Sequence, residues 1–126
     1  MHILLFATCQ SATIQDGRVD AKGLFNTMTA EKFPATLTLN AVVWVSPDPG
    51  EAGSYVFRIR RTCADASVFE HIEKRKWTAQ VHHDTHALAE MLPVQFVVYE
   101  PEIAHLQLVR NDEVIATFDL EVRQKE

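Results

Sequence analysis

Apolar residues recur at every second position along most of the chain. The clearest case is 114–122, where apolar side chains alternate with polar or charged ones such as Asp119. A period of two is typical of β-strands with one face buried and the other in water. The segment 104–108 repeats the pattern, and the turn-forming residues Asn111 and Asp112 lie between the two segments. The sequence therefore predicts a β-hairpin in this part of the chain.

Other segments predict further strands, most of them by alternation and 2–9 as a buried apolar run. They are 2–9, 19–25, 35–46, 55–60, 77–81 and 94–98. Asp16 and Gly17 supply the positive φ that a tight hairpin needs between the first two segments. In the third segment Val42 and Trp44 make the second face partly apolar as well. We therefore expect that strand to be central in its sheet or covered by a neighbour.

The segment 84–92 is the one place where the sequence predicts a helix. Asp84 is a suitable N-cap, and Pro93 would end the helix after two turns at most. Three apolar residues, Leu88, Met91 and Leu92, are spaced so that they would lie on one face of a helix. Because strands and helices do not alternate along the chain, parallel α/β folds are disfavoured.

These elements together predict a single all-β domain over residues 1–126. Short strands separated by turns are typical of an antiparallel β-sandwich, and we expect seven to eight strands here. The two layers would be Ig-like or C2-like, with at most one short helix near 84–92. Composition agrees, because 126 residues of which 47% are apolar suit one soluble globular domain.

The net charge and the length of the apolar runs indicate which classes of binding partner are disfavoured. The net charge is −5, and residues 64–126 hold twelve of the 17 acidic side chains. An acidic surface repels nucleic acid and anionic membranes, so both are disfavoured as partners. No apolar run approaches the roughly 20 residues of a membrane span. We expect a protein partner or self-association instead.

The chain has two cysteines, Cys9 and Cys63, and their number helps to predict the cellular compartment. The apolar run 3–7 is shorter than the roughly 7–15 residues of a signal-peptide core, and no Lys or Arg precedes it. A chain of this length does not need a disulfide to fold. We therefore predict a cytoplasmic protein with reduced cysteines.

The first part of the chain resembles a known family. Gly23-Leu24-Phe25, then Phe33-Pro34-Ala35 leading into the apolar strand 39–43, is similar to the pattern of a bacterial family of small domains of unknown function. The resemblance implies a β-sandwich without catalytic residues. The chain departs from that pattern at Glu100-Pro101-Glu102-Ile103, where a Pro-Gly-x-Tyr element is expected.

The strongest chemical feature is a cluster of histidines, His82, His83 and His86, around Asp84. Imidazole and carboxylate groups suit zinc and similar divalent metals, and His83 and His86 would share one face of a helical turn. His71 and His105 are candidate distant ligands. The alternative is that these are solvated loop histidines, with no cofactor bound.

A basic stripe is the second candidate. Its members on two predicted strands are Arg58, Arg60 and Arg61, and Lys74, Arg75, Lys76 and Trp77. If the strands pair, they form a positive patch beside an aromatic ring, which is suited to single-stranded nucleic acid or an anionic protein. Ordinary Arg–Glu pairs on a wet sheet face are the alternative.

The remaining chemistry does not indicate catalysis. The carboxylate pairs Glu100/Glu102 and Asp119/Glu121 are expected to lie in water, and no phosphate-binding glycine loop or nucleophile motif is present. Cys9 is expected to be inert core. The sequence therefore predicts a non-catalytic module that binds a protein partner or a second copy of itself, with a zinc-type metal protein as the alternative.

Overall fold

The computed structural model describes residues 1–16, 18–62, 68–69 and 76–126, and for residues 68, 69 and 76 the backbone alone. The strands in this part of the chain are β1 (His2–Cys9), β2 (Ser11–Gln15), β3 (Arg18–Lys22), β4 (Thr27–Ala30), β5 (Ala35–Ser46), β6 (Gly53–Thr62), β7 (Val68–Phe69), β8 (Lys76–Val81), β9 (Leu88–Val98), β10 (Glu102–Arg110) and β11 (Glu113–Gln124).

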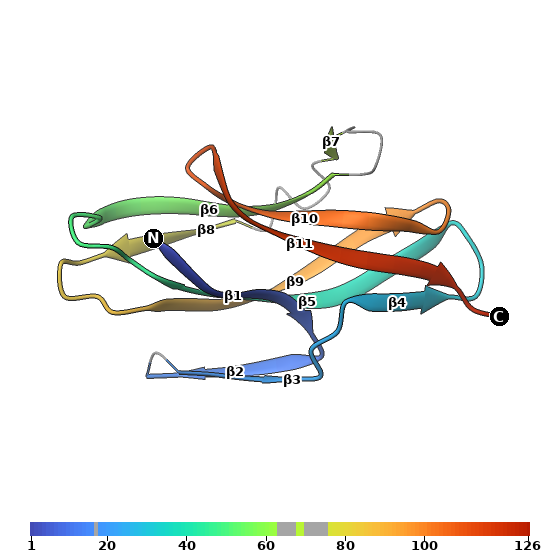
Figure 1. Ribbon diagram of the computed structural model, residues 1–126, viewed down its shortest axis with the longest axis horizontal. Coiled ribbons are helices and arrows are strands. Elements are labelled where there is room, and N and C mark those ends of the chain that lie inside the picture. The colour runs from blue at the N-terminus through green and yellow to red at the C-terminus, as the bar shows by residue number, and fades with distance from the viewer. Residues whose placement is uncertain (17, 63–67, 70–75) are drawn as a thin grey trace.

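The strands form three sheets (Figure 1). The three-stranded sheet has the order β1-β5-β9 and is antiparallel. The six-stranded sheet has the order β4-β11-β10-β6, and both β7 and β8 pair with β6. It is mixed, because β4 runs parallel to β11. The third sheet is the β2–β3 hairpin.

The core lies between the two larger sheets. Figure 1 shows β6, β10 and β11 above β5 over the middle of the molecule. The facing side chains come from alternate positions, as the period of two predicts. On β5 they are Leu37, Leu39, Ala41, Val43 and Val45, and on the opposite sheet they include Phe57, Ile59, Leu106, Leu108 and Leu120, all buried.

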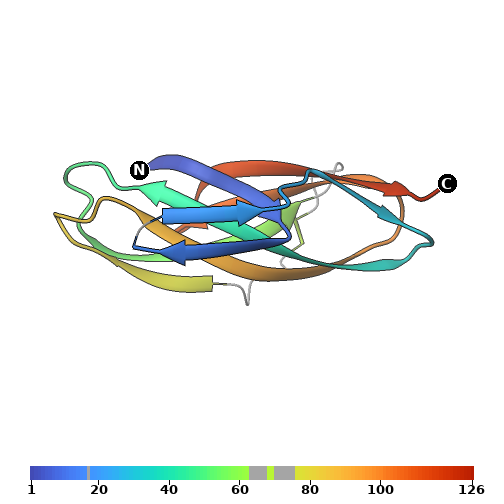
Figure 2. The ribbon, with the colours of Figure 1, turned by 90° about the horizontal axis from the view of Figure 1, so that it is seen from below.

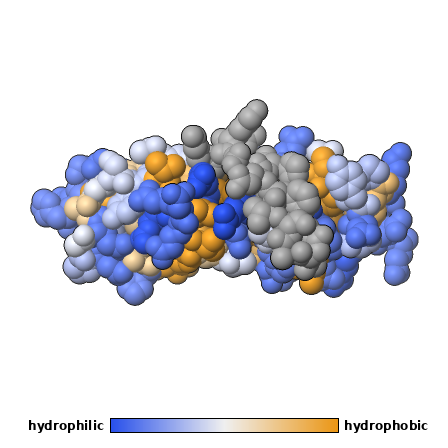
Figure 3. Space-filling model, turned by 90° about the horizontal axis from the view of Figure 1, so that it is seen from above, coloured by the Kyte–Doolittle hydropathy of each residue, from blue (hydrophilic) through white to orange (hydrophobic). Residues whose placement is uncertain are grey.

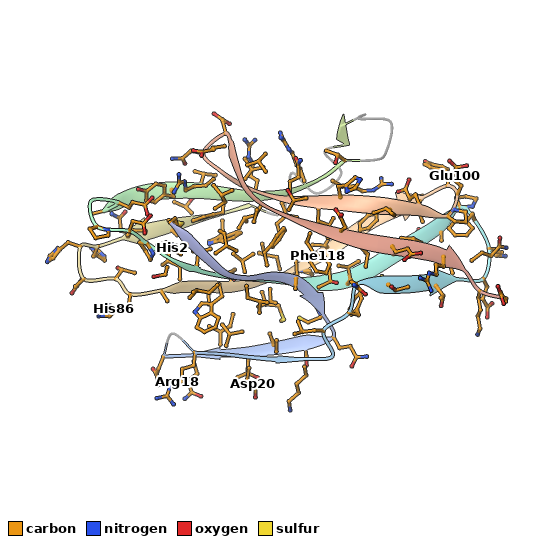
Figure 4. The ribbon with its side chains drawn as sticks, in the orientation of Figure 1. His2, Arg18, Asp20, His86, Glu100 and Phe118 are labelled. Carbon is orange, nitrogen blue, oxygen red and sulfur yellow. The ribbon has the colours of Figure 1, made fainter. Side chains whose placement is uncertain are left out.

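The second face of the three-stranded sheet is covered by the β2–β3 hairpin (Figures 1 and 2). Val42 is fully buried on this face, in register with Ala7 and Met91. The hairpin alternates apolar with polar residues, and Arg18 and Asp20 point away from the sheet (Figure 4). This confirms the prediction that the apolar second face of strand 35–46 belongs to a central, covered strand.

Along one side, the two larger sheets close against each other through β1 and β11. The rings of Phe6 and Phe118 meet edge to face at 6.5 Å between centroids, and Figure 4 labels Phe118. The pairing of β1 with β5 ends at Cys9↔Asn40, whereas β5 continues to Ala35. Beyond that point β4 takes the place beside β11.

The all-β class and the predicted β-hairpin are confirmed, but two details of the predicted fold are wrong. The described residues form eleven strands in three sheets, not a sandwich of seven to eight strands. They contain no helix, and so none long and apolar enough to cross a membrane. The predicted helix near 84–92 is a loop followed by β9, because 88–92 pair with β5 as strand residues.

Candidate binding site

An apolar pocket of about 530 Å³ lies where β1 turns away from β5. Its lining comes from the end of β1, the β3–β4 connection, β4 and β5. The lining residues are Cys9, Gln10, Gly23, Leu24, Phe25, Thr27, Met28, Thr38, Leu39 and Asn40. None of them carries a charge, and most of the larger side chains are apolar. The pocket therefore suits an uncharged, largely apolar occupant.

Local hydrogen bonds fix the rim of this pocket. The backbone N–H of Gln10 donates to Lys22 O at 3.0 Å and Gly23 O at 3.1 Å. Asn40 Nδ2 donates to Gln10 O at 2.9 Å. Gly23 has φ +65°, and a Cβ there would lie 2.6 Å from the Gln10 side chain, so this position favours glycine. The rim therefore has a defined shape.

The β3–β4 connection is tied to β1 in the same way. Phe25 N donates to Thr8 O at 3.1 Å, and Thr8 Oγ1 donates to Phe25 O at 2.6 Å. Phe25 and Met28 pack against the core, while Leu24 remains 54% exposed. An exposed leucine beside an apolar pocket is a suitable anchor for a partner.

Cys9 forms part of the pocket wall and is 1% exposed. Burial raises the pKa of its thiol, because the thiolate would lose its solvation. The thiol therefore stays protonated at neutral pH and acts as a small apolar group, as the sequence predicts. Cys63 lies outside the described residues.

The histidine cluster lies in the loop between β8 and β9. His82, His83 and His86 are all exposed and line a second pocket of about 430 Å³ with the 47–52 loop. His82 N donates to Thr85 Oγ1 at 2.9 Å, so the loop makes a turn instead of the predicted helical turn.

Among the described residues, no group of three or more His, Cys, Asp or Glu side chains is arranged to hold a metal ion. Of the two distant candidates, His71 lies outside the described residues, and His105 Nδ1 lies 2.6 Å from Asp119 Oδ1. Figure 4 shows instead His2 at the same end of the molecule as His86. His2 could not be predicted as part of this end of the molecule, because no neighbouring residue along the chain marks it.

The carboxylates at this end already have cationic partners. The N-terminal ammonium lies 2.5 Å from Asp48 Oδ2 and 2.7 Å from Glu51 Oε1. Hydrogen bonds from this ammonium hold the pKa of both carboxyls below their usual range. Arg110 Nη1 is 2.8 Å from Glu51 Oε2, and His2 Nε2 is 2.9 Å from Asp48 Oδ1. A metal ion at this end would compete with the N-terminal ammonium and with Arg110.

The predicted basic stripe is divided between two faces of the six-stranded sheet. Arg58 and Arg60 lie on the outer face, where Arg58 Nη2 is 2.7 Å from Asp112 Oδ1 and Arg60 Nε donates to Gln107 Oε1 at 2.7 Å. Figure 3 views the molecule from this side, where hydrophilic and hydrophobic side chains are mixed. β6 and β8 do pair as expected, with Arg58 opposite Lys76. Lys74 lies outside the described residues.

Arg61 and Trp77 do not belong to that outer patch. Arg61 has the strand parity of the buried Ile59, is 3% exposed, and forms an ion pair with Glu102. Trp77 stacks on the buried Phe57 with ring centroids 4.7 Å apart. The prediction of one patch is therefore wrong for these two residues, because neighbouring positions on a strand face opposite ways.

The ion pair with Arg61 shows that the prediction for the Glu100/Glu102 pair is wrong at Glu102. Glu102 is 17% exposed in this ion pair and does not lie in water as predicted. Asp119 is exposed, as predicted, and Glu121 is half-buried, with a hydrogen bond from Arg123 that lowers the pKa of Glu121. A lowered pKa at Glu121 is the opposite of what a general acid at neutral pH requires.

A family model matches residues 4–123 of this chain. The chain belongs to DUF6941, a family of unknown function. No curated protein matches it. The DUF6941 match confirms the predicted membership in a family of unknown function, and a bacterial distribution stays a prediction. The matched range includes every residue that lines the apolar pocket.

Proposed function

We propose that this DUF6941 chain is a non-catalytic protein-interaction module that binds a partner polypeptide at the apolar pocket. The observation that carries the proposal is the pocket itself, which is uncharged, holds about 530 Å³ and has Leu24 exposed at its rim. This volume falls within the roughly 300–1,000 Å³ of small-ligand sites and accommodates large apolar side chains.

The chemistry of the lining favours protein over the other partner classes. The cores of protein interfaces are depleted in charged residues and contain apolar anchors that fill pockets. Nucleic acid requires cations, and the lining of this pocket has none. As the sequence analysis predicts, we place this activity in the cytoplasm, with reduced cysteines and without a cofactor.

Leu24→Lys tests this proposal. Linear peptides are selected from a random phage-displayed library against the folded protein, and the dissociation constants of the enriched peptides are measured by fluorescence anisotropy. We expect Leu24→Lys to weaken their binding about 30-fold, because loss of an interface anchor costs about 2 kcal/mol. Ile103→Lys, at a similarly exposed apolar residue on β10, is the matched control and should bind as the wild type does. A library without enriched peptides, or equal binding by both variants, contradicts the proposal.

A divalent-metal site at the histidine loop is the second candidate function. The observation in its favour is the pocket of about 430 Å³ that His82, His83 and His86 share with Asp48 and Glu51. Calorimetric titration of untagged protein with zinc should then give one site per chain, lost in the double variant His83→Ala and His86→Ala. His105→Ala, on β10, is the control and should keep the site. Sub-stoichiometric zinc with an unchanged melting temperature rejects this function.

A further inference from the structure

We infer that the partner binds at the apolar pocket as an added β-strand, paired with the open edge of β5 at Ala35–Leu39. The inference rests on the proposed function and specifies its partner, an extended and uncharged peptide segment. Strand addition is a common mode of peptide recognition, in which backbone hydrogen bonds supply affinity and pockets supply specificity.

β5 is paired unequally along its two sides. On one side it pairs with β9 from Val45↔Leu88 to Ala35↔Val98. On the other side its pairing with β1 ends at Asn40↔Cys9. Within the described part of the chain, no strand pairs with Ala35–Leu39 on that side. Alternate residues of this segment therefore present N–H and C=O groups to an open edge.

The space beside that edge lies between β5 and β4. β1 stops pairing with β5 after Cys9, and the pocket begins at this point. Thr38 and Leu39 line the pocket on the β5 side, and Thr27 and Met28 line it on the β4 side. Figure 2 shows β4 and the start of β5 diverging from their connecting turn. A partner that reaches β5 must enter between two strands, so the space suits one linear segment rather than the edge of another folded sheet.

This edge of β5 lacks the residues that usually protect an open strand. Open strand edges usually carry charges or proline that prevent pairing with another chain. The open edge of β9 has Glu90 and Pro93, and β8 begins with Lys76. Ala35–Leu39 and the facing β4 have neither, since their sequences are ATLTL and TMTA. Alternating Thr and Leu also favours the extended conformation.

Register determines the side chains of the partner. In an antiparallel pair, residues directly opposite each other point to the same face. Leu37 and Leu39 point into the core, and Thr36 and Thr38 are exposed. Partner residues opposite the leucines therefore lie on the core side, where Leu39 lines the apolar pocket, and those opposite the threonines lie on the exposed face. The expected motif is about five residues in which apolar side chains alternate with variable ones.

Amide hydrogen exchange, followed by residue-resolved NMR, tests the inference. The probe is the tightest of the phage-selected peptides described above, added to wild-type protein. We expect every second amide of Ala35–Leu39 to exchange at least about tenfold more slowly in the complex, with no such change along the open edge of β9. Binding that slows none of these amides overturns the inference.

Backbone methylation of the same peptide supplies an independent readout. N-methylation removes one backbone donor and leaves the side chains unchanged. We expect losses of affinity of about tenfold at alternate positions and little change between them, because only alternate N–H groups face β5. A uniform response along the peptide overturns strand addition. If that peptide still loses affinity in Leu24→Lys, the interaction function stands without strand addition, so the two failures are distinguishable.

Discussion

Replacing Arg61 by alanine should lower the free energy of unfolding by about 3–5 kcal/mol. Its guanidinium is buried between the two larger sheets, lies 5.0 Å from the centroid of the Phe96 ring, and pairs with Glu102. The substitution removes the packing on Phe96 and leaves a largely buried carboxylate without this counterion. Breaking one partner of a buried pair is costly because the other charge loses its compensation.

Urea denaturation followed by circular dichroism measures this effect. Arg60→Ala is the matched control, one residue away on the outer face, and should cost less than about 1 kcal/mol. The double variant Arg61→Met with Glu102→Gln should recover much of the loss, because apolar replacement of a buried pair is often tolerated. A loss below about 1 kcal/mol for Arg61→Ala would show that this pair does not stabilise the contact between the sheets.

The sequence alone shows which residues of a strand share a face, because alternate positions point the same way. This rule explains which side chains of β6 could be predicted as buried. The alternation around Phe57 and Ile59 defines the buried face of β6, and Arg61 continues the same series. The same rule correctly indicates that Arg58 and Arg60 are on the other face. Grouping Arg61 with those two followed proximity along the chain instead of parity, and the error is physical, since a strand separates neighbours onto opposite faces.

The false helix shows where local pattern is insufficient. Leu88, Met91 and Leu92 satisfy helical spacing, but pairing with β5 fixes their backbone as a strand. Pro93 does not prevent this, because β9 is at an edge, where a missing N–H is tolerated. The pairing of β9 with β5 determines that these residues form a strand, and β5 lies far away in the chain.

The apolar pocket could not be predicted because its walls are distant in sequence. Segments around Cys9, Leu24, Met28 and Leu39 meet only after β1 leaves β5 and β4 joins β11. The Gly23-Leu24-Phe25 motif was the one local signal in this region. Its glycine has the positive φ of the rim, and its leucine is the exposed anchor. The four-residue β4 carries no clear alternation, so its parallel pairing had no sequence signal.

Replacing Phe57 by alanine should lower the free energy of unfolding by about 3–5 kcal/mol as well. Phe57 is fully buried on β6, stacks on Trp77 and lies 6.4 Å from the centroid of the Tyr55 ring. Loss of the ring would leave a cavity and would remove contacts both with the core and with Trp77 on β8. Chemical denaturation measures the loss, and Phe57→Leu, which keeps most of the volume, should cost markedly less.

The Phe57 variant also tests the assignment of Trp77 to the core rather than to a nucleic-acid surface. In a Trp44→Phe background Trp77 is the sole tryptophan, because the chain has two. Fluorescence of the folded state should then shift to longer wavelength in Phe57→Ala as the indole loses its stacking partner and gains water. Unchanged fluorescence, together with a loss of stability below about 1 kcal/mol, would show that the stacked pair does not support β8. Trp77 would then be available as an aromatic surface group, and the nucleic-acid interpretation of this strand would have to be reconsidered.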